Sequence, residues 1–391
     1  MRSNLAWLAC LLAVAACSDK PSENTPSASA PISSGAPATS SSSAAPSASA
    51  ASPAPTTSAA TAPKYRAPDC AEQPPASPPP LVGQPDATIK AMLEKVASCD
   101  PDPIERCADL DAVVSEASDR ANGDDTTKKS SAIAACVGAI SHKSPRVRIA
   151  AAGCLFELAF SAEPPGPVAG RLLDRLDTED NEDVRQHLAA AIGKVGVTKA
   201  GYTCRVIDRI RNRSEALVDA ELVTSLKPFG GMVRAPVTDA AFDFAYELVM
   251  ADRPGSAGGR AMSILTNPPE GRTKETCPRL AEAVAAGVNH WGHAATELWK
   301  LDDCHDRRDL IVTRTLSELK AVESAPNYGA ASRQLMDLEF VEDLPTREGV
   351  SSEQKKSLCD AAASLAKNAK DADCKKRGEK MVALCEKKES P

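Results

Sequence analysis

The sequence predicts an all-α fold, an α-solenoid of antiparallel helix pairs, that follows an N-terminal linker expected to be disordered. From about residue 82 onward, apolar residues recur with helical spacing between short polar breaks. No segment alternates apolar and polar residues as a half-buried strand requires. In addition, the pair Val147-Arg148 and its surroundings recur 37 residues later as Val184-Arg185, which is a spacing typical of helical repeats.

The chain divides into three predicted parts: a signal peptide (1–16), a lipidated cysteine with a linker (17–81) and the helical domain (82–391). The signal peptide is indicated by Arg2, a mostly apolar run over 5–14 and two small residues, Ala15 and Ala16. That apolar run is too short for a permanent transmembrane helix. The linker consists mostly of Ser, Ala, Pro and Thr, and therefore cannot bury enough apolar surface to fold. We expect a plain spacer, with a glycosylated stalk as the alternative.

The segment Val14-Ala15-Ala16-Cys17 resembles the bacterial lipobox. The resemblance implies cleavage after Ala16 and a diacylglycerol on the sulfur of Cys17, which would anchor the protein to a membrane of the bacterial cell envelope. Ser18 in the next position resembles an outer-membrane sorting signal, although Asp19 weakens this inference, and the expected location is the outer membrane. The alternative is a simple signal peptide with a chance cysteine.

The remaining cysteines also indicate export. Eleven are left after Cys10 and Cys17 are set aside, and an oxidising compartment would pair many of them. Because eleven is odd, at least one must stay unpaired or pair between chains.

Sixteen helices are predicted within the domain. Ser144-Pro145 supplies a hydroxyl at an N-cap followed by a proline in the first turn, and Asn181 supplies a second cap. The predicted ranges are 86–98, 104–121, 127–140, 145–160, 167–176, 183–195, 201–210, 214–226, 236–250, 258–265, 277–288, 291–301, 306–321, 330–340, 352–368 and 374–387.

The segments 144–152 and 181–189 resemble the HEAT-repeat family, through the Val-Arg pair after a capping turn and the Ala-rich stretch that follows. In that family the arginine joins a polar ladder between repeats, and the resemblance implies this structural role for Arg148 and Arg185. The resemblance is clear over 144–196 and weaker elsewhere. An irregular helical bundle with one chance repeat is the alternative.

One cluster has the residue types of a metal site. His290 and His293 could share a helix face, and Cys304 and His305 follow downstream. However, the intervening helix would separate its two ends by about 15 Å. Cys277 opens the preceding helix and is expected near Cys304. We therefore predict a Cys277–Cys304 disulfide, keep His290 and His293 as weak metal candidates, and expect no cofactor.

The composition restricts the possible functions. A net charge of −7 argues against a protein that wraps nucleic acid, and 3% aromatic residues argue against stacking on single strands. There is no P-loop or nucleophile motif. The cationic segment 375–377 is interpreted as a solvated helix face, with contact to anionic lipid or polysaccharide as the alternative. We therefore expect a non-catalytic scaffold for an unknown envelope protein or peptide. The alternative is an enzyme or enzyme-accessory protein whose active site is unrecognised.

Overall fold

The computed structural model describes residues 78, 80–81, 83–99, 107–159, 166–198, 201–227, 237–251 and 257–386. The signal peptide, Cys17 and nearly all of the linker lie outside these residues. Within them the fold is all-helical, with sixteen α-helices, two short 3₁₀ helices and no strand. This confirms the predicted fold class.

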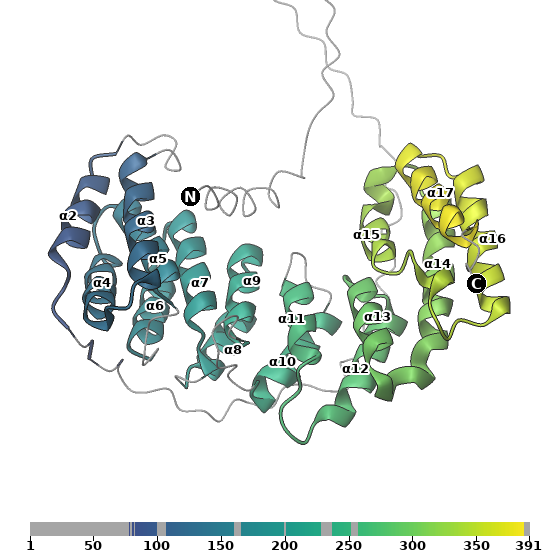
Figure 1. The fold of residues 1–391 in the computed structure, drawn as a ribbon, viewed down its shortest axis with the longest axis horizontal. Coiled ribbons are helices and arrows are strands. Elements are labelled where there is room, and N and C mark those ends of the chain that lie inside the picture. Colours follow the sequence, from purple (N-terminus) through teal and green to yellow (C-terminus); the bar gives the residue numbers. More distant parts are fainter. Residues whose placement is uncertain are drawn as a thin grey trace, which may run out of the picture. The chain divides into compact units, whose positions relative to one another are not determined.

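The helices form two layers, and neighbours along the chain alternate between them (Figure 1). The first layer consists of α2 (Ala87–Val96), α4 (Thr126–Ala139), α6 (Gly166–Thr178), α8 (Thr203–Asn212), α10 (Asp239–Met250), α12 (Thr273–Ala286), α14 (Arg308–Ser324) and α16 (Ser352–Asn368). The second layer consists of α3 (Ala108–Asn122), α5 (Pro145–Leu158), α7 (Glu182–Val195), α9 (Ala216–Ser225), α11 (Ala257–Leu265), α13 (Trp291–Lys300), α15 (Tyr328–Glu339) and α17 (Ala372–Glu386). Each second-layer helix packs against the next one in that layer, so the domain is α-solenoid-like.

All sixteen predicted helices are present, with most ends within three residues of the prediction. The largest differences are at two helix starts: α3 begins at Ala108 and not at 104, and α12 begins at Thr273 and not at 277. Pro278 therefore lies inside α12. A proline in this position cannot donate a backbone hydrogen bond to the preceding turn. Two 3₁₀ helices, η4 (Asp302–Arg307) and η5 (Leu344–Thr346), were not predicted.

Of the two N-caps predicted from the sequence, one forms the expected hydrogen bond. Asn181 Oδ1 accepts a hydrogen bond from the backbone N–H of Val184 at 3.0 Å, as predicted. Ser144 is the N-cap of α5 and Pro145 follows it, but the Ser144 side chain makes no capping hydrogen bond. The predicted position of Ser144 at the N-cap is therefore correct, although its hydroxyl does not form the capping hydrogen bond.

Small residues allow the helices of the second layer to approach closely. Ala150, Ala151 and Ala152 on α5 are completely buried. On α7, a Cβ at Gly193 would lie 2.9 Å from the carbonyl oxygen of Glu221 in α9. A larger residue at Gly193 would push these two helices apart.

The two repeated arginines occupy equivalent positions and join successive repeats. Arg148 donates from Nε and Nη2 to the carboxylate of Glu179 at 2.7 and 2.8 Å, and from Nη1 to the carbonyl oxygens of His142 and Lys143. Arg185 donates from Nε to Glu215 at 2.6 Å. Its Nη1 donates to the carbonyl oxygens of the preceding turn, as Arg148 does. The ladder that the HEAT resemblance implied is therefore present between these repeats.

The spacing of inter-repeat contacts changes along the chain. In the middle of the domain, contacts link residues 36 apart, as in Arg211 to Glu247 and Arg279 to Asp243. Towards the C-terminus they link residues 44 to 46 apart, as in Thr296 to Phe340 and Arg333 to Gly287. The longer spacing accommodates η4 and the 17-residue helices α14 and α16.

The described residues before α2 contact two first-layer helices, α6 and α4. The ring of Pro78 lies against Gly170 of α6, where an added Cβ would come within 2.8 Å of it. Leu81 packs against the core, and the backbone N–H of Asp86 donates to the carbonyl oxygen of Ser131 in α4. Pro78 and Leu81, assigned to the linker from the sequence, thus contact the helical domain.

Candidate binding surface on helices α15 and α17

The structure joins the predicted cysteine pair. The sulfurs of Cys277 in α12 and Cys304 in η4 are bonded, and the Cα atoms lie 5.4 Å apart. Three further bonds join Cys99 to Cys107, Cys136 to Cys154 and Cys359 to Cys385, and Cys204 is also disulfide-bonded. Cys374 is buried as a free thiol, in keeping with the odd number of cysteines.

The two candidate metal ligands, His290 and His293, contact different helices. His290 is in the left-handed region, with φ of 67°, and its ring packs on Gly258 and Gly259 of α11. The ring of His293 stacks on Phe340 at the end of α15, with 5.6 Å between the centroids. Burial lowers the pKa of His293, against a smaller opposing effect of Glu297. No group of three or more potential metal ligands occurs among the residues that the structure describes.

Helices α13 and α15 meet at a tight junction. A Cβ on Gly292 would lie 2.1 Å from the carbonyl oxygen of Asp337, so this position accepts only glycine. The buried Asp337 carboxylate in turn accepts a hydrogen bond from the Gly292 backbone N–H at 3.0 Å. Burial raises the pKa of Asp337 to about 6, although this hydrogen bond and the charge of Arg333 oppose the shift. This junction fixes the position of α15 against α13.

The Asp337→Asn variant should be more stable than the natural protein above pH 7. The folded-state pKa of about 6 lies above the ordinary value of 3.8, so ionised Asp337 disfavours folding. The contribution of the protonated Asp337 carboxyl to folding stability is complete below pH 3.8 and is lost as the pH rises through 6. Each pKa unit corresponds to about 1.4 kcal/mol, so we expect a gain of about 1–3 kcal/mol in urea unfolding at pH 8. The two proteins should converge near pH 4, and a constant difference across this range would contradict the assignment.

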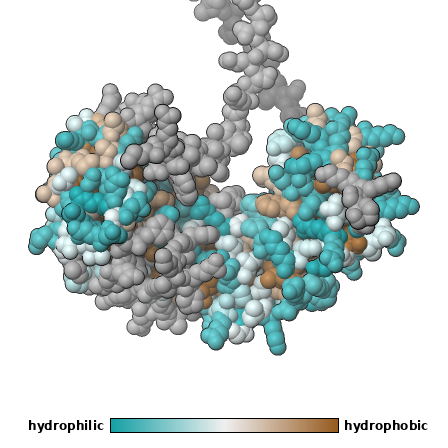
Figure 2. All heavy atoms as spheres, in the orientation of Figure 1, coloured by the Kyte–Doolittle hydropathy of each residue, from teal (hydrophilic) through white to brown (hydrophobic). Residues whose placement is uncertain are grey.

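Helix α15 carries an exposed apolar stripe. Tyr328, Met336 and Phe340 are 47%, 54% and 44% exposed, and their spacing of eight and four residues places them on one side of the helix. Figure 2 shows a mainly hydrophilic surface on the face in view, where apolar atoms appear only in small patches. The only other large apolar residue exposed to this degree in the described part is Leu217, on α9. All four therefore belong to the second layer.

Cationic side chains of α17 stand beside this stripe. A hollow of about 370 Å³ lies between α15 and α17, with Tyr328, Leu335 and Met336 on one side and Lys376, Arg377 and Lys380 on the other; Glu339 and Asp373 complete its lining. Arg377 and Lys380 both pair with Glu342 at 2.6 Å. An apolar side and a cationic side in one hollow suit a ligand with apolar and acidic groups.

We define the α15–α17 surface as Tyr328, Leu335, Met336, Phe340, Lys376 and Lys380. Both helices were predicted from the sequence, but this surface was not. The only sequence signal that falls on it is the cationic segment 375–377, which was interpreted as a solvated helix face.

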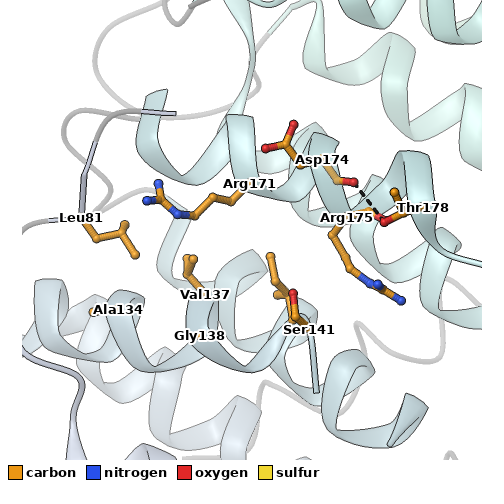
Figure 3. A pocket seen from close by; sticks show the side chains of 10 residues that line it. Leu81, Ala134, Val137, Gly138, Ser141, Arg171, Asp174, Arg175 and Thr178 are labelled. Atoms are coloured by element: carbon orange, nitrogen blue, oxygen red, sulfur yellow. Dashed lines mark hydrogen bonds between the residues drawn. The ribbon is translucent and has the colours of Figure 1, made fainter. Parts of the chain in front are cut away.

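A second hollow, of about 550 Å³, lies between α4 and α6 (Figure 3). Val137, Ile140 and Leu81 line it together with charged residues of α6. These charged groups hold the fold together: Arg175 pairs with Glu179, and Asp174 pairs with Arg205 of α8. Their pairing makes this hollow a weaker candidate than the α15–α17 surface.

Comparisons with known proteins identify no relative. No protein-family profile and no curated protein matches the sequence. Among solved structures, the crystal structure of an engineered protein is similar, with 14% sequence identity, coverage of 77% of this chain and 79% of that chain, and a TM-score of 0.36. None of the described helices is long and apolar enough to cross a membrane. At this TM-score the similarity identifies neither a family nor a function for this chain.

Proposed function

We propose that this protein is a lipid-anchored component of the bacterial cell envelope, and that its helical domain is a non-catalytic scaffold for a protein or peptide. The observation that carries the scaffold function is the α15–α17 surface, where the exposed side chains of Tyr328 and Met336 line a hollow together with cationic residues. Exposed apolar groups with a polar surround are typical of interaction sites. The two-layered repeat stack supports this proposal, because such folds offer long continuous surfaces to partners.

The anchor part of the proposal depends on the lipobox resemblance at 14–17. A diacylglycerol at Cys17 would hold the chain at a membrane, and residues 18–77 would separate the helical domain from the bilayer. Ser18 at the position after the cysteine resembles an outer-membrane sorting signal.

Cys17→Ala should release the protein from membranes or leave its signal peptide uncleaved, because the lipid would have no attachment site. The measurement is membrane fractionation after extraction with high salt. Cys10→Ala is the matched control, since it also removes a cysteine from the N-terminal segment but leaves the lipobox intact, and it should stay membrane-bound. Unchanged retention of the Cys17 variant would reject the anchor.

The scaffold function is tested by site-specific photocross-linking in intact cells. A benzophenone amino acid in place of Met336 should yield a discrete adduct with one envelope protein. The same group in place of Lys356, exposed on the first-layer helix α16, should not yield it. If the same adducts arise from both positions, or none from either, the α15–α17 surface is not a binding site. Turnover abolished by changing His290 or His293 would favour the enzyme alternative.

A further inference from the structure

We infer that the α15–α17 surface binds an amphipathic helix of the partner whose apolar face lies along α15 and whose acidic flank faces α17. This inference rests on the proposed scaffold function and adds the chemistry of the bound segment. Three properties of the surface carry it: the length of the apolar stripe, the placement of the cations, and the hollow between them.

The stripe has the dimensions of a helix-binding site. Tyr328 and Phe340 lie twelve positions apart, which corresponds to about 18 Å along the axis of α15. Tyr328 lines the hollow, whereas Phe340 lies beyond it against His293 of α13. Met336 lies between them, and the buried Leu335 lines the hollow beside it. A helix in a groove offers apolar anchors every three or four residues, so three turns or more of a partner helix would cover this stripe.

The cations define the second requirement. Lys376 and Lys380 are four residues apart on α17, so they lie on one side of that helix, and both are exposed. Within the described part of the chain Lys376 forms no ion pair, whereas Lys380 shares Glu342 with Arg377. Three cationic and two acidic residues line the hollow, and Glu342, which pairs with Arg377 and Lys380, neutralises the remaining charge. The attraction for an acidic ligand therefore comes mainly from Lys376. Carboxylates four residues apart on the partner would face the two lysines.

An anionic membrane fits this surface less well than a helix. A bilayer contact needs apolar side chains that protrude together with an unbroken basic surround. Here the apolar and cationic residues line a hollow, and Glu339 and Asp373 interrupt the basic side. Both acids would be repelled by anionic headgroups, whereas a single helix can leave them solvated.

The test uses the whole purified chain and two synthetic helical peptides of about 18 residues, which is long enough to cover the stripe. One carries leucines on one face and glutamates on an adjoining flank, and the other has lysines in place of the glutamates. We expect fluorescence anisotropy to show binding of the glutamate peptide only, with an affinity that falls as salt is added. Equal binding of both peptides, or of neither, would overturn the inference.

Matched variants locate the site. Lys376→Glu with Lys380→Glu should weaken binding of the glutamate peptide about tenfold or more, because two attractions become repulsions. The control is Lys356→Glu with Lys367→Glu on α16, which changes the net charge equally but outside the hollow, and it should have less than about a twofold effect. Met336→Ser tests the apolar side with native charges, and it should also reduce binding. Equal losses in the α16 control would overturn the inference.

The outcome is separable from that of the scaffold function. A specific Met336 adduct in cells, together with no preference for the glutamate peptide, would retain the scaffold and reject the acidic helix. Binding of phosphatidylglycerol vesicles that the Lys376/Lys380 variant abolishes, without peptide binding, would instead assign the surface to lipid.

Discussion

Arg148→Ala should lower the free energy of unfolding by about 3–5 kcal/mol, because it leaves the Glu179 carboxylate buried without its main partner. The side chains of Arg148 and Glu179 are 7% and 0% exposed. Burial alone would raise the pKa of Glu179, but hydrogen bonds from Arg148, the Asn181 N–H and Arg175 lower it to about 2. The measurement is urea unfolding followed by circular dichroism at pH 7.

Arg185→Ala is the matched control at the equivalent position of the next repeat. Arg185 and Glu215 are 19% and 25% exposed, so water compensates part of the lost interaction, and we expect a smaller loss of about 1–2 kcal/mol. Equal losses at the two positions would contradict the role of burial.

The stability of the natural protein should also depend on pH through Glu179. Because the pKa of Glu179 is depressed in the folded state, the ionised carboxylate should stabilise the fold fully above pH 4.5, and this contribution should fall as the pH drops towards 2.

Replacing Cys277 and Cys304 together with alanine should cost about 3–4 kcal/mol. The bond joins residues 27 apart and therefore restricts the conformations of the unfolded chain. Without the bond the unfolded chain has more conformational entropy, which lowers the free energy of unfolding. It also removes a completely buried sulfur at Cys304 from the core between α12, α13 and η4. Thermal or urea unfolding of the non-reduced protein measures the difference.

The Cys359–Cys385 bond provides the comparison, since it spans 26 residues and should contribute the same chain-entropy effect. Both of its cysteines are only partly buried. The Cys277/Cys304 variant should therefore lose more stability than the Cys359/Cys385 variant, by about the cost of a small cavity, roughly 1 kcal/mol. Peptide mapping without reductant that finds Cys277 and Cys304 as free thiols would reject the bond itself.

The helices could be predicted from the sequence because each has a local signal. Apolar spacing and polar breaks located all sixteen, and the Val-Arg pairs at 147–148 and 184–185 identified the repeat. Those two arginines are also the ladder residues of the structure, since they perform the same task in the same position of two repeats.

The repeat was hard to follow beyond residue 196 for a physical reason. Contacts between repeats lengthen from 36 to about 45 residues, so no single period aligns the two halves of the domain. η4 and η5 contribute to this lengthening and have few residues each, which leaves little sequence pattern. The start of α12 was missed because Pro278 normally marks a first turn, whereas here the helix begins one turn earlier.

The candidate site could not be predicted because it depends on which helix faces are left uncovered. Apolar spacing in α15 is the same whether Met336 packs inside or faces solvent. Likewise, the pairing of Lys380 with Glu342 depends on how α15 and α17 pack, as does the absence of an ion pair for Lys376 among the described residues. Only the packed arrangement distinguishes a binding stripe from a core face.

The path of residues 78–86 has a mechanical consequence. The chain reaches α2 only after crossing α6 at Gly170 and α4 at Ser131. If the protein is tethered through its N-terminus, tension would first load the contact of Pro78 with α6 and not the end of α2. Detaching α2 requires the whole crossing segment to be pulled free, including its hydrogen bond to Ser131. Under such tension the terminal helix pair would be shielded from unzipping.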